Sequence, residues 1–323
     1  MFAAISNLFG YLLNFLYELV NNNFGFAIIL FSILLRIILL PITIKQQKSM
    51  EKTNQIQGEL KALQFKYKNN PEMLNKETME LYKREKISPF SGCLSAIAQI
   101  IIILSVFYLV SQPLTYMKKA NDKNPELKAV VEQYKSEIKE SNSKTRYIEI
   151  ATIARMRDDY NKISNESQVE NTENQNVENT ENAENNEVVQ NKEDLTKKKE
   201  LLEKLNVNME FLGLDLSKVP SENLKDFTVY IIPVLYVVSS FISIRMTTNM
   251  KKKNDKDDKK DGKDEPDPMA QMSKSMSYMM PIMTLSIAFI APLGLALYWF
   301  VSNVLMIVER VVIKKVMTNK EAE

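Results

Sequence analysis

Residues 24–44 read FGFAIILFSILLRIILLPITI, an apolar run that carries a single charge, Arg36. A helix needs about 20 consecutive apolar residues to cross the hydrocarbon core of a bilayer. The run meets this length, and its one arginine lies well inside it. The stretch therefore predicts a transmembrane helix, which we place at 22–44.

Further apolar runs follow the first one. The last run is too long for one span, and Pro292 and Gly294 break it, which predicts a tight hairpin of two helices. The sequence thus predicts an all-α, polytopic membrane protein with a core of five transmembrane helices. After the first span, the predicted spans are 90–112, 227–247, 277–291 and 293–313.

Composition excludes several function classes. The 323-residue chain has no histidine and one cysteine, Cys93, so the commonest general base and metal ligand is missing and no disulfide framework can form. None of its seven glycines forms a phosphate-binding loop. We expect neither an enzyme nor a metal or other cofactor.

The charges between the spans predict the orientation. Residues 1–23 contain no Lys or Arg, whereas 45–89, 248–276 and 314–323 are rich in lysine. Cytoplasmic loops of membrane proteins carry this excess, which predicts an external N-terminus and a cytoplasmic C-terminus. Residues 1–21 have apolar residues at helical spacing, which favours an amphipathic helix on the outer membrane surface. A cleaved signal segment is the alternative.

The loops differ in composition. Residues 45–89 carry apolar residues at helical spacing in two arms, such as Ile56, Leu60 and Leu63 in the first, which predicts a cytoplasmic helical hairpin rather than a solvated linker. Residues 113–226 form an external insertion whose acidic, Asn-rich part, 165–193, predicts disorder. We interpret 248–276 as a charged cytoplasmic loop and 314–323 as a short tail.

Arg36 is the strongest functional signal. A charged residue at the centre of a span costs about 2.5–3.5 kcal/mol on insertion scales and usually faces a bundle interior or water. No Asp or Glu lies deep in a predicted span, and Glu309 lies near a cytoplasmic end. Without a partner, Arg36 could extend its side chain to the interface. We favour a hydrated groove that keeps it charged.

Other polar residues lie in the same spans. Ser32 precedes Arg36 by one helical turn, and Tyr298-Trp299 follow the predicted hairpin turn. Each polar residue alone is more typical of helix–helix hydrogen bonding, and each aromatic residue of an interfacial belt. Taken together they support a polar groove. The remaining members of the set are Gln99, Ser239, Ser240, Ser243, Ser302 and Asn303.

Three stretches carry a family resemblance: FSILLRIILLPITIKQQKSM, LYKREKISPFSGCLSAIAQIIIILSVFYLV and PLGLALYWFVSNVLMIVERVVI. In order and spacing they are similar to the YidC-type membrane protein insertase and assembly-factor family. MEFLGLDLSKVP, at 209–220, also resembles the external stretch before that family's third core helix. The resemblance implies a groove open to cytoplasm and lipid, in which Arg36 is the groove arginine.

The resemblance also implies roles for other residues. Ser32 matches the neighbouring hydroxyl position, Tyr298 and Trp299 match an aromatic pair that faces the arginine, and Gln99 falls in the matching part of the second core helix. The third helix departs from the pattern at Ser243, and the external insertion is much longer than in compact relatives. The candidate client-binding residues are Arg36, Ser32, Gln99, Tyr298, Trp299, Ser243 and Asn303.

The implied function is insertion and folding of newly made membrane proteins. Its partners would be nascent membrane-protein clients, membrane lipids and the ribosome through the cytoplasmic loops, with the Sec translocon as a further candidate and no sequence-specific nucleic acid. Two alternatives remain open. One is an anion channel or transporter that uses Arg36 for selectivity, and the other is a membrane-anchored scaffold whose external insertion is the functional part.

Overall fold

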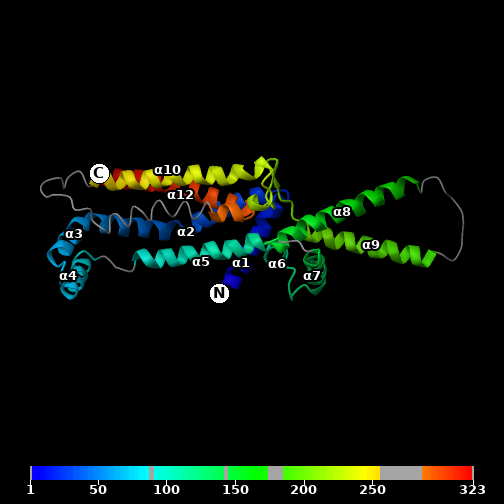
Figure 1. Ribbon diagram of the computed structural model, residues 1–323, viewed down its shortest axis with the longest axis horizontal. Helices are drawn as coiled ribbons and strands as arrows, with labels where there is room; N and C mark the ends of the chain where they lie inside the picture. Colours follow the sequence, from blue (N-terminus) through cyan, green and yellow to red (C-terminus); the bar gives the residue numbers. More distant parts are fainter. Residues whose placement is uncertain (1, 87–90, 142–144, 174–184, 255–285, 322–323) are drawn as a thin grey trace. The chain divides into compact units, whose positions relative to one another are not determined.

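The computed structural model describes residues 2–86, 91–141, 145–173, 185–254 and 286–321 (Figure 1). These ranges are almost entirely helical, which confirms the all-α prediction. The chain divides into two compact units. Unit 1 comprises Met1–Ile28, Ser105–Asn223 and Pro292–Leu295, and unit 2 comprises Ile29–Leu104, Leu224–Ala291 and Ala296–Glu323.

Long apolar helices confirm the polytopic membrane class. Within the described residues, three helical stretches have the length and composition to cross a membrane: Phe24–Thr53, Phe227–Met246 and Leu293–Ile313. The second predicted span forms helix α5, Ser91–Ser111. Most of the fourth predicted span, 277–291, lies outside the described residues. Within its described part, residues 286–290 are helical. The total of five spans stays a prediction.

The helices that carry the spans run beyond the predicted ends. Helix α2 extends over Phe24–Gln55 with Pro41 inside it, so the hairpin predicted from residue 45 begins as a continuation of α2. Helices α10, Ile231–Asn254, and α12, Leu293–Glu321, likewise enter the predicted loop and tail. Lysine, glutamine and glutamate are good helix formers, so a change from apolar to polar residues ends the span without ending the helix.

The predicted hairpin forms at α3, Gln57–Lys66, and α4, Pro71–Arg84. Asn70 starts α4 as its N-cap, because its side chain accepts a hydrogen bond from the backbone N–H of Met73, and proline occupies the first helical position. A small apolar core holds the two arms together. It consists of Ile56, Leu60, Leu63, Leu81 and Tyr82, which include the predicted stripe.

Unit 1 contains three packed helices, α7 (Pro125–Glu140), α8 (Ile148–Glu173) and α9 (Asn185–Leu205). Their contacts bury large side chains such as Tyr134, Met156 and Leu202. The two longer helices include both ends of the stretch 165–193, for which the sequence predicts disorder, and residues 174–184 of that stretch lie outside the described residues. Helices anchored by a packed core can extend into polar sequence that would not fold alone.

The other elements of unit 1 include α1, Phe2–Leu19, and α6, Pro113–Tyr116. One face of α1 is buried around Gly10, where an added Cβ would lie 2.0 Å from the backbone oxygen of Tyr116, so only glycine allows this approach. The opposite face exposes a stripe of large apolar side chains. Its members are Leu8, Tyr11, Phe15 and Leu19.

Strands β1, Glu210–Phe211, and β2, Leu214–Asp215, form a short antiparallel hairpin. Its two turn residues, Leu212 and Gly213, both have positive φ, as a two-residue type I′ turn requires. A 3-10 helix, η2 (Pro220–Glu222), follows, and η3 (Phe227–Tyr230) leads into α10 in unit 2. The carbonyls of Leu216 and Lys218 accept from the backbone N–H groups of Gly294 and Leu293, which satisfies the start of α12.

Candidate functional site

Arg36 lies on α2 and binds α12 within unit 2. Its Nη1 atom is 3.2 Å from Oε2 of Glu309, and its Nη2 donates to the backbone carbonyl of Ser302 at 3.1 Å. The side chains are 20% and 7% exposed, respectively. The arginine is thus held by a largely buried ion pair and a backbone carbonyl.

This pair corrects the sequence interpretation, in which Arg36 has no carboxylate partner. Glu309 lies inside the apolar stretch Leu293–Ile313, and its long side chain reaches the guanidinium. The similar depth of the two residues in their spans could have indicated this pair from the sequence. In the predicted topology α2 and α12 run in the same direction, and at 1.5 Å per residue Arg36 and Glu309 lie roughly 18 Å and 24 Å from the starts of their helices.

The second carboxylate oxygen of Glu309 is unlike the first. Oε1 is buried and has no hydrogen-bond partner among the described residues. A buried, ionised oxygen without a partner is costly, and buried polar atoms nearly always have partners in folded proteins. The site therefore contains a carboxylate oxygen whose hydrogen-bonding capacity is not used by the described residues.

Arg310 adds a second cation at the next position of α12. Its Nη1 donates to Oγ of Ser243 on α10 at 3.3 Å, and Nη2 lies 3.7 Å from the sulfur of Met306. Sequence reasoning missed this residue although it lies in the same apolar stretch. Two arginines and one glutamate therefore give this cluster, Arg36–Glu309–Arg310, a formal charge of +1.

Asn303 joins α12 to α10. Its side-chain amide donates to Oγ of Ser239 at 2.9 Å and to Oγ of Ser240 at 3.0 Å, and all three residues are buried. Hydrogen bonds of this kind hold transmembrane helices together. A client-binding role for Asn303 and Ser243 stays a prediction, because their described hydrogen bonds are made within the bundle.

The two aromatic residues point to different partners. Tyr298 is 5% exposed, with the side chain of Ser302 as its hydrogen-bonding neighbour and Arg36 within electrostatic range. Trp299 instead contacts the ring of Tyr236 on α10, at 6.3 Å between centroids. The two rings thus have different neighbours: Tyr298 lies beside Ser302, whose carbonyl binds Arg36, and Trp299 lies beside Tyr236. This difference follows from the 100° between successive residues on a helix.

The remaining predicted site residues are less informative. Ser32 is buried on α2, one turn before Arg36. Gln99 belongs to α5, but its side chain lies outside the described residues. Of the predicted site residues, Arg36 and Ser243 thus contact α12, and Tyr298 and Asn303 belong to it. The structure adds Glu309 and Arg310 to the set.

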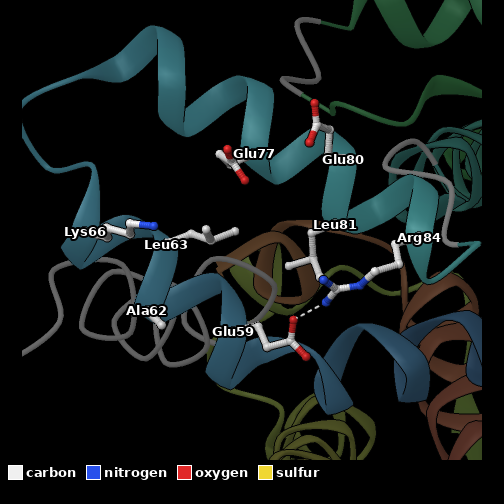
Figure 2. A pocket seen from close by; sticks show the side chains of 8 residues that line it. All are labelled: Glu59, Ala62, Leu63, Lys66, Glu77, Glu80, Leu81 and Arg84. Atoms are coloured by element: carbon white, nitrogen blue, oxygen red, sulfur yellow. Dashed lines mark hydrogen bonds and ion pairs between the residues drawn. The ribbon is translucent and has the colours of Figure 1, made fainter.

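A second candidate location is the α3–α4 hairpin. A cavity of about 460 Å³ lies between its two arms. Figure 2 shows Glu59 and Arg84 paired across it, with Glu77, Glu80 and Lys66 along its walls. These charges are exposed, or in Glu77 partly exposed, and mixed in sign, so they favour a polar partner of no particular charge. Among the described residues, no group of carboxylates and thiols could hold a metal ion.

Comparison with known proteins identifies the chain's relatives. The family model described as 60Kd inner membrane protein matches residues 15–144 and 194–321, which together make up most of the chain. The chain belongs to the 60Kd inner membrane protein family. With its apolar helices, this membership makes it an integral membrane protein of a bacterial inner membrane.

Three curated members of this family share part of the chain, and each is named membrane protein insertase YidC. The protein of Fusobacterium nucleatum is 42% identical over 109 residues, which is 32% of this chain and 53% of the relative. The protein of Caldanaerobacter subterraneus is 42% identical over 108 residues, 33% and 52% of the two chains. That of Francisella tularensis subsp. novicida is 38% identical over 110 residues, 34% and 20%. The matches span about half or less of each relative.

Proposed function

We propose that the protein inserts newly made membrane proteins into the bilayer through the Arg36–Glu309–Arg310 cluster. The observation that carries the proposal is a largely buried ion pair between two apolar helices that leaves one carboxylate oxygen without a described partner. Membership in a family whose named relatives are insertases supports the same function.

The physical role of the cluster is to replace water. A client's polar N-terminal tail must cross the hydrocarbon core, and each unsatisfied polar group costs several kcal/mol there. Charged donors, and an acceptor without a partner among the described residues, offer the tail hydrogen bonds inside the span and lower this cost. The client's apolar segment then enters lipid, driven by transfer of apolar surface. No nucleotide or metal takes part.

We further propose that the cytoplasmic hairpin receives the client or the ribosome that makes it. Phe65 on α3 is 85% exposed, and aromatic side chains serve as anchors in protein interfaces. The Sec translocon and membrane lipids are the other partners that we propose. The termini would lie outside and in the cytoplasm, respectively, as the lysine distribution predicts.

The test is insertion of a single-spanning client with an acidic N-tail into proteoliposomes, measured by protease protection. Arg36→Lys keeps the charge and should retain insertion. Arg36→Ala alone would leave Glu309 buried without its counter-ion, which confounds function with folding. The informative variant is therefore Arg36→Ala combined with Glu309→Gln, for which we expect about a tenfold loss, or ~1.4 kcal/mol.

A second candidate function gains support from the structure. Transport by coupled charges needs more than one intramembrane ionisable group, and Glu309 and Arg310 supply them beside Arg36. Ion flux through proteoliposomes without any client separates the two functions. Flux that depends on Arg36 would favour a channel or transporter, and insertion by the Arg36→Ala, Glu309→Gln variant at the native rate would contradict the insertase mechanism.

A further inference from the structure

The charges around Arg36 suggest how the site selects its clients. Glu309 already gives Arg36 the partner that an acidic client would otherwise supply, and its Oε1 oxygen offers a basic client an acceptor. We propose that Glu309 is a resident counter-ion that holds the place of a client carboxylate, so that the site accepts both acidic and basic tails. This inference rests on the insertase function proposed above.

The geometry allows the exchange. A guanidinium has five N–H donors, and the described hydrogen bonds of Arg36 use Nη1 and Nη2 once each. A client carboxylate can therefore approach the same guanidinium while Glu309 is still bound, and then take its place. Arg310, one residue from Glu309, offers a neighbouring cation during the exchange.

The burial of Glu309 favours exchange over a permanent structural ion pair between the helices. A structural ion pair in a low-dielectric interior is favourable when the remaining lone pairs are satisfied as well. Glu309 is 7% exposed, yet one of its oxygens has no partner among the described residues. A donor brought by a client, or water that accompanies it, would complete the site.

The charge balance leads to a clear expectation. With Glu309 ionised, the cluster carries +1, and without it +2. A unit charge at contact distance changes binding by more than a factor of ten even near a protein surface. Loss of Glu309 should therefore strengthen the preference for acidic tails and weaken the acceptance of basic ones.

The experiment uses the full-length protein in proteoliposomes and three single-spanning clients that differ at one N-tail position, which is Asp, Asn or Lys. The variants are native, Glu309→Gln, Glu309→Asp and, as a control with the same charge change on an exposed face of α9, Glu203→Gln. Initial insertion rates are measured by protease protection. We expect the native Asp-to-Lys rate ratio to lie within a few fold of one.

In Glu309→Gln that ratio should rise about tenfold, through a faster Asp client and a slower Lys client. Glu309→Asp and Glu203→Gln should keep the native ratio. Equal losses for all three clients would show a structural staple and overturn the proposal. So would a hundredfold native preference for Asp over Lys, which is measured without any variant.

The Asn client separates this inference from the function on which it rests. If the native protein does not insert the Asn client, the insertase proposal itself fails. If it inserts that client and the Asp-to-Lys ratio is the same in native and Glu309→Gln, insertion stands and the counter-ion role is rejected.

Discussion

Two buried glutamates, Glu149 in unit 1 and Glu309 in unit 2, are bound in contrasting ways. Both oxygens of Glu149 are satisfied: Oε2 accepts from the backbone N–H of Thr115, and Oε1 accepts from the Thr115 hydroxyl group at 2.6 Å and from Lys135 at 3.1 Å. Glu309 has one oxygen paired with Arg36, and its other oxygen has no partner among the described residues.

The contrast separates a structural carboxylate from one that is available for binding. A buried charge contributes to a rigid fold when its whole hydrogen-bonding capacity is used. Glu149 fulfils that condition and joins α6, α7 and α8. Glu309 does not, and its remaining capacity lies in the helix that also carries Tyr298 and Arg310. Burial alone would have placed the two residues in one class.

Substituting glutamine at each position should give the largest effect. In Glu149→Gln, the new amide places N–H donors against donors from Thr115 or Lys135 and leaves the lysine without its buried partner. We expect unit 1 to lose about 3 kcal/mol. In Glu309→Gln the amide oxygen can still accept from Arg36, and Arg36 keeps the carbonyl of Ser302, but the arginine loses its counter-ion and the new NH₂ group has no acceptor among the described residues. We therefore expect a smaller loss, about 1–2 kcal/mol.

Hydrogen exchange of α7 and α8 in nanodiscs measures the first change, and thermal unfolding of the whole protein measures the second. Glu140→Gln, at an exposed position of α7, is the control and should behave as native. Equal destabilisation by the two glutamine variants would erase the distinction between the carboxylates.

A smaller effect is expected at Asn303, which tests whether every polar side chain on α12 is available for binding. Asn303→Ala removes the bonds to Ser239 and Ser240 and should cost about 1 kcal/mol, in the range measured for hydrogen bonds between membrane helices. The ratio of Asp-client to Lys-client insertion should not change. Thermal unfolding and the insertion assay measure the two outcomes, with exposed Val304→Ala as the control. A changed client ratio would extend the binding site to Asn303.

The smallest effect concerns pH and sharpens the comparison in unit 1. Burial lowers the pKa of Lys118, with a smaller opposing effect from Glu18, and its Nζ lies 4.8 Å from the centre of the Tyr17 ring. The unfolded chain then binds more protons than the folded one between the lowered pKa and the ordinary value. Stability of unit 1 should therefore rise with pH as pH approaches 10.5 from below.

The pKa of Lys135 shifts in the opposite direction. Burial lowers its pKa, but Glu149 and Glu132 outweigh burial and raise it overall, so its contribution is fully present below pH 10.5 and is lost above it. Lys118→Met should reduce the rise below pH 10.5, to which Lys119 also contributes because burial lowers its pKa, and should leave the loss above it. Hydrogen exchange of α1 and α7 across this range checks both. A rise that is unchanged in Lys118→Met would assign it to another group.

The sequence was sufficient for the fold class because hydrophobic length is a local signal. The runs around Arg36 and Trp299 exceed the thickness of a bilayer core, and the stripe at Ile56, Leu60 and Leu63 marks a hairpin arm without any tertiary information. Helix ends were predicted less well. Lysine-rich segments after the spans continue the helices, since a membrane boundary changes the solvent and leaves helix propensity unchanged.

The site was only partly predictable, for a physical reason. Arg36 is conspicuous because charge in an apolar run is rare, but its partner depends on which helix faces it. The sequence interpretation excluded Glu309 as a partner because it lies far from the middle of its span. The long side chains of glutamate and arginine together bridge this offset. The separate contacts of Tyr298 and Trp299 likewise depend on helix rotation, which sequence spacing alone did not fix.

Pro41 affects the backbone hydrogen bonding of α2. It lies inside α2 and has no N–H group, so the carbonyl of Ile37, next to Arg36, loses its usual helical donor. In hydrocarbon, such a carbonyl needs a hydrogen bond from water or from a neighbouring segment. The covalent structure of the chain thus leaves a backbone acceptor beside Arg36 without its helical donor, and it does so whatever the protonation of nearby side chains.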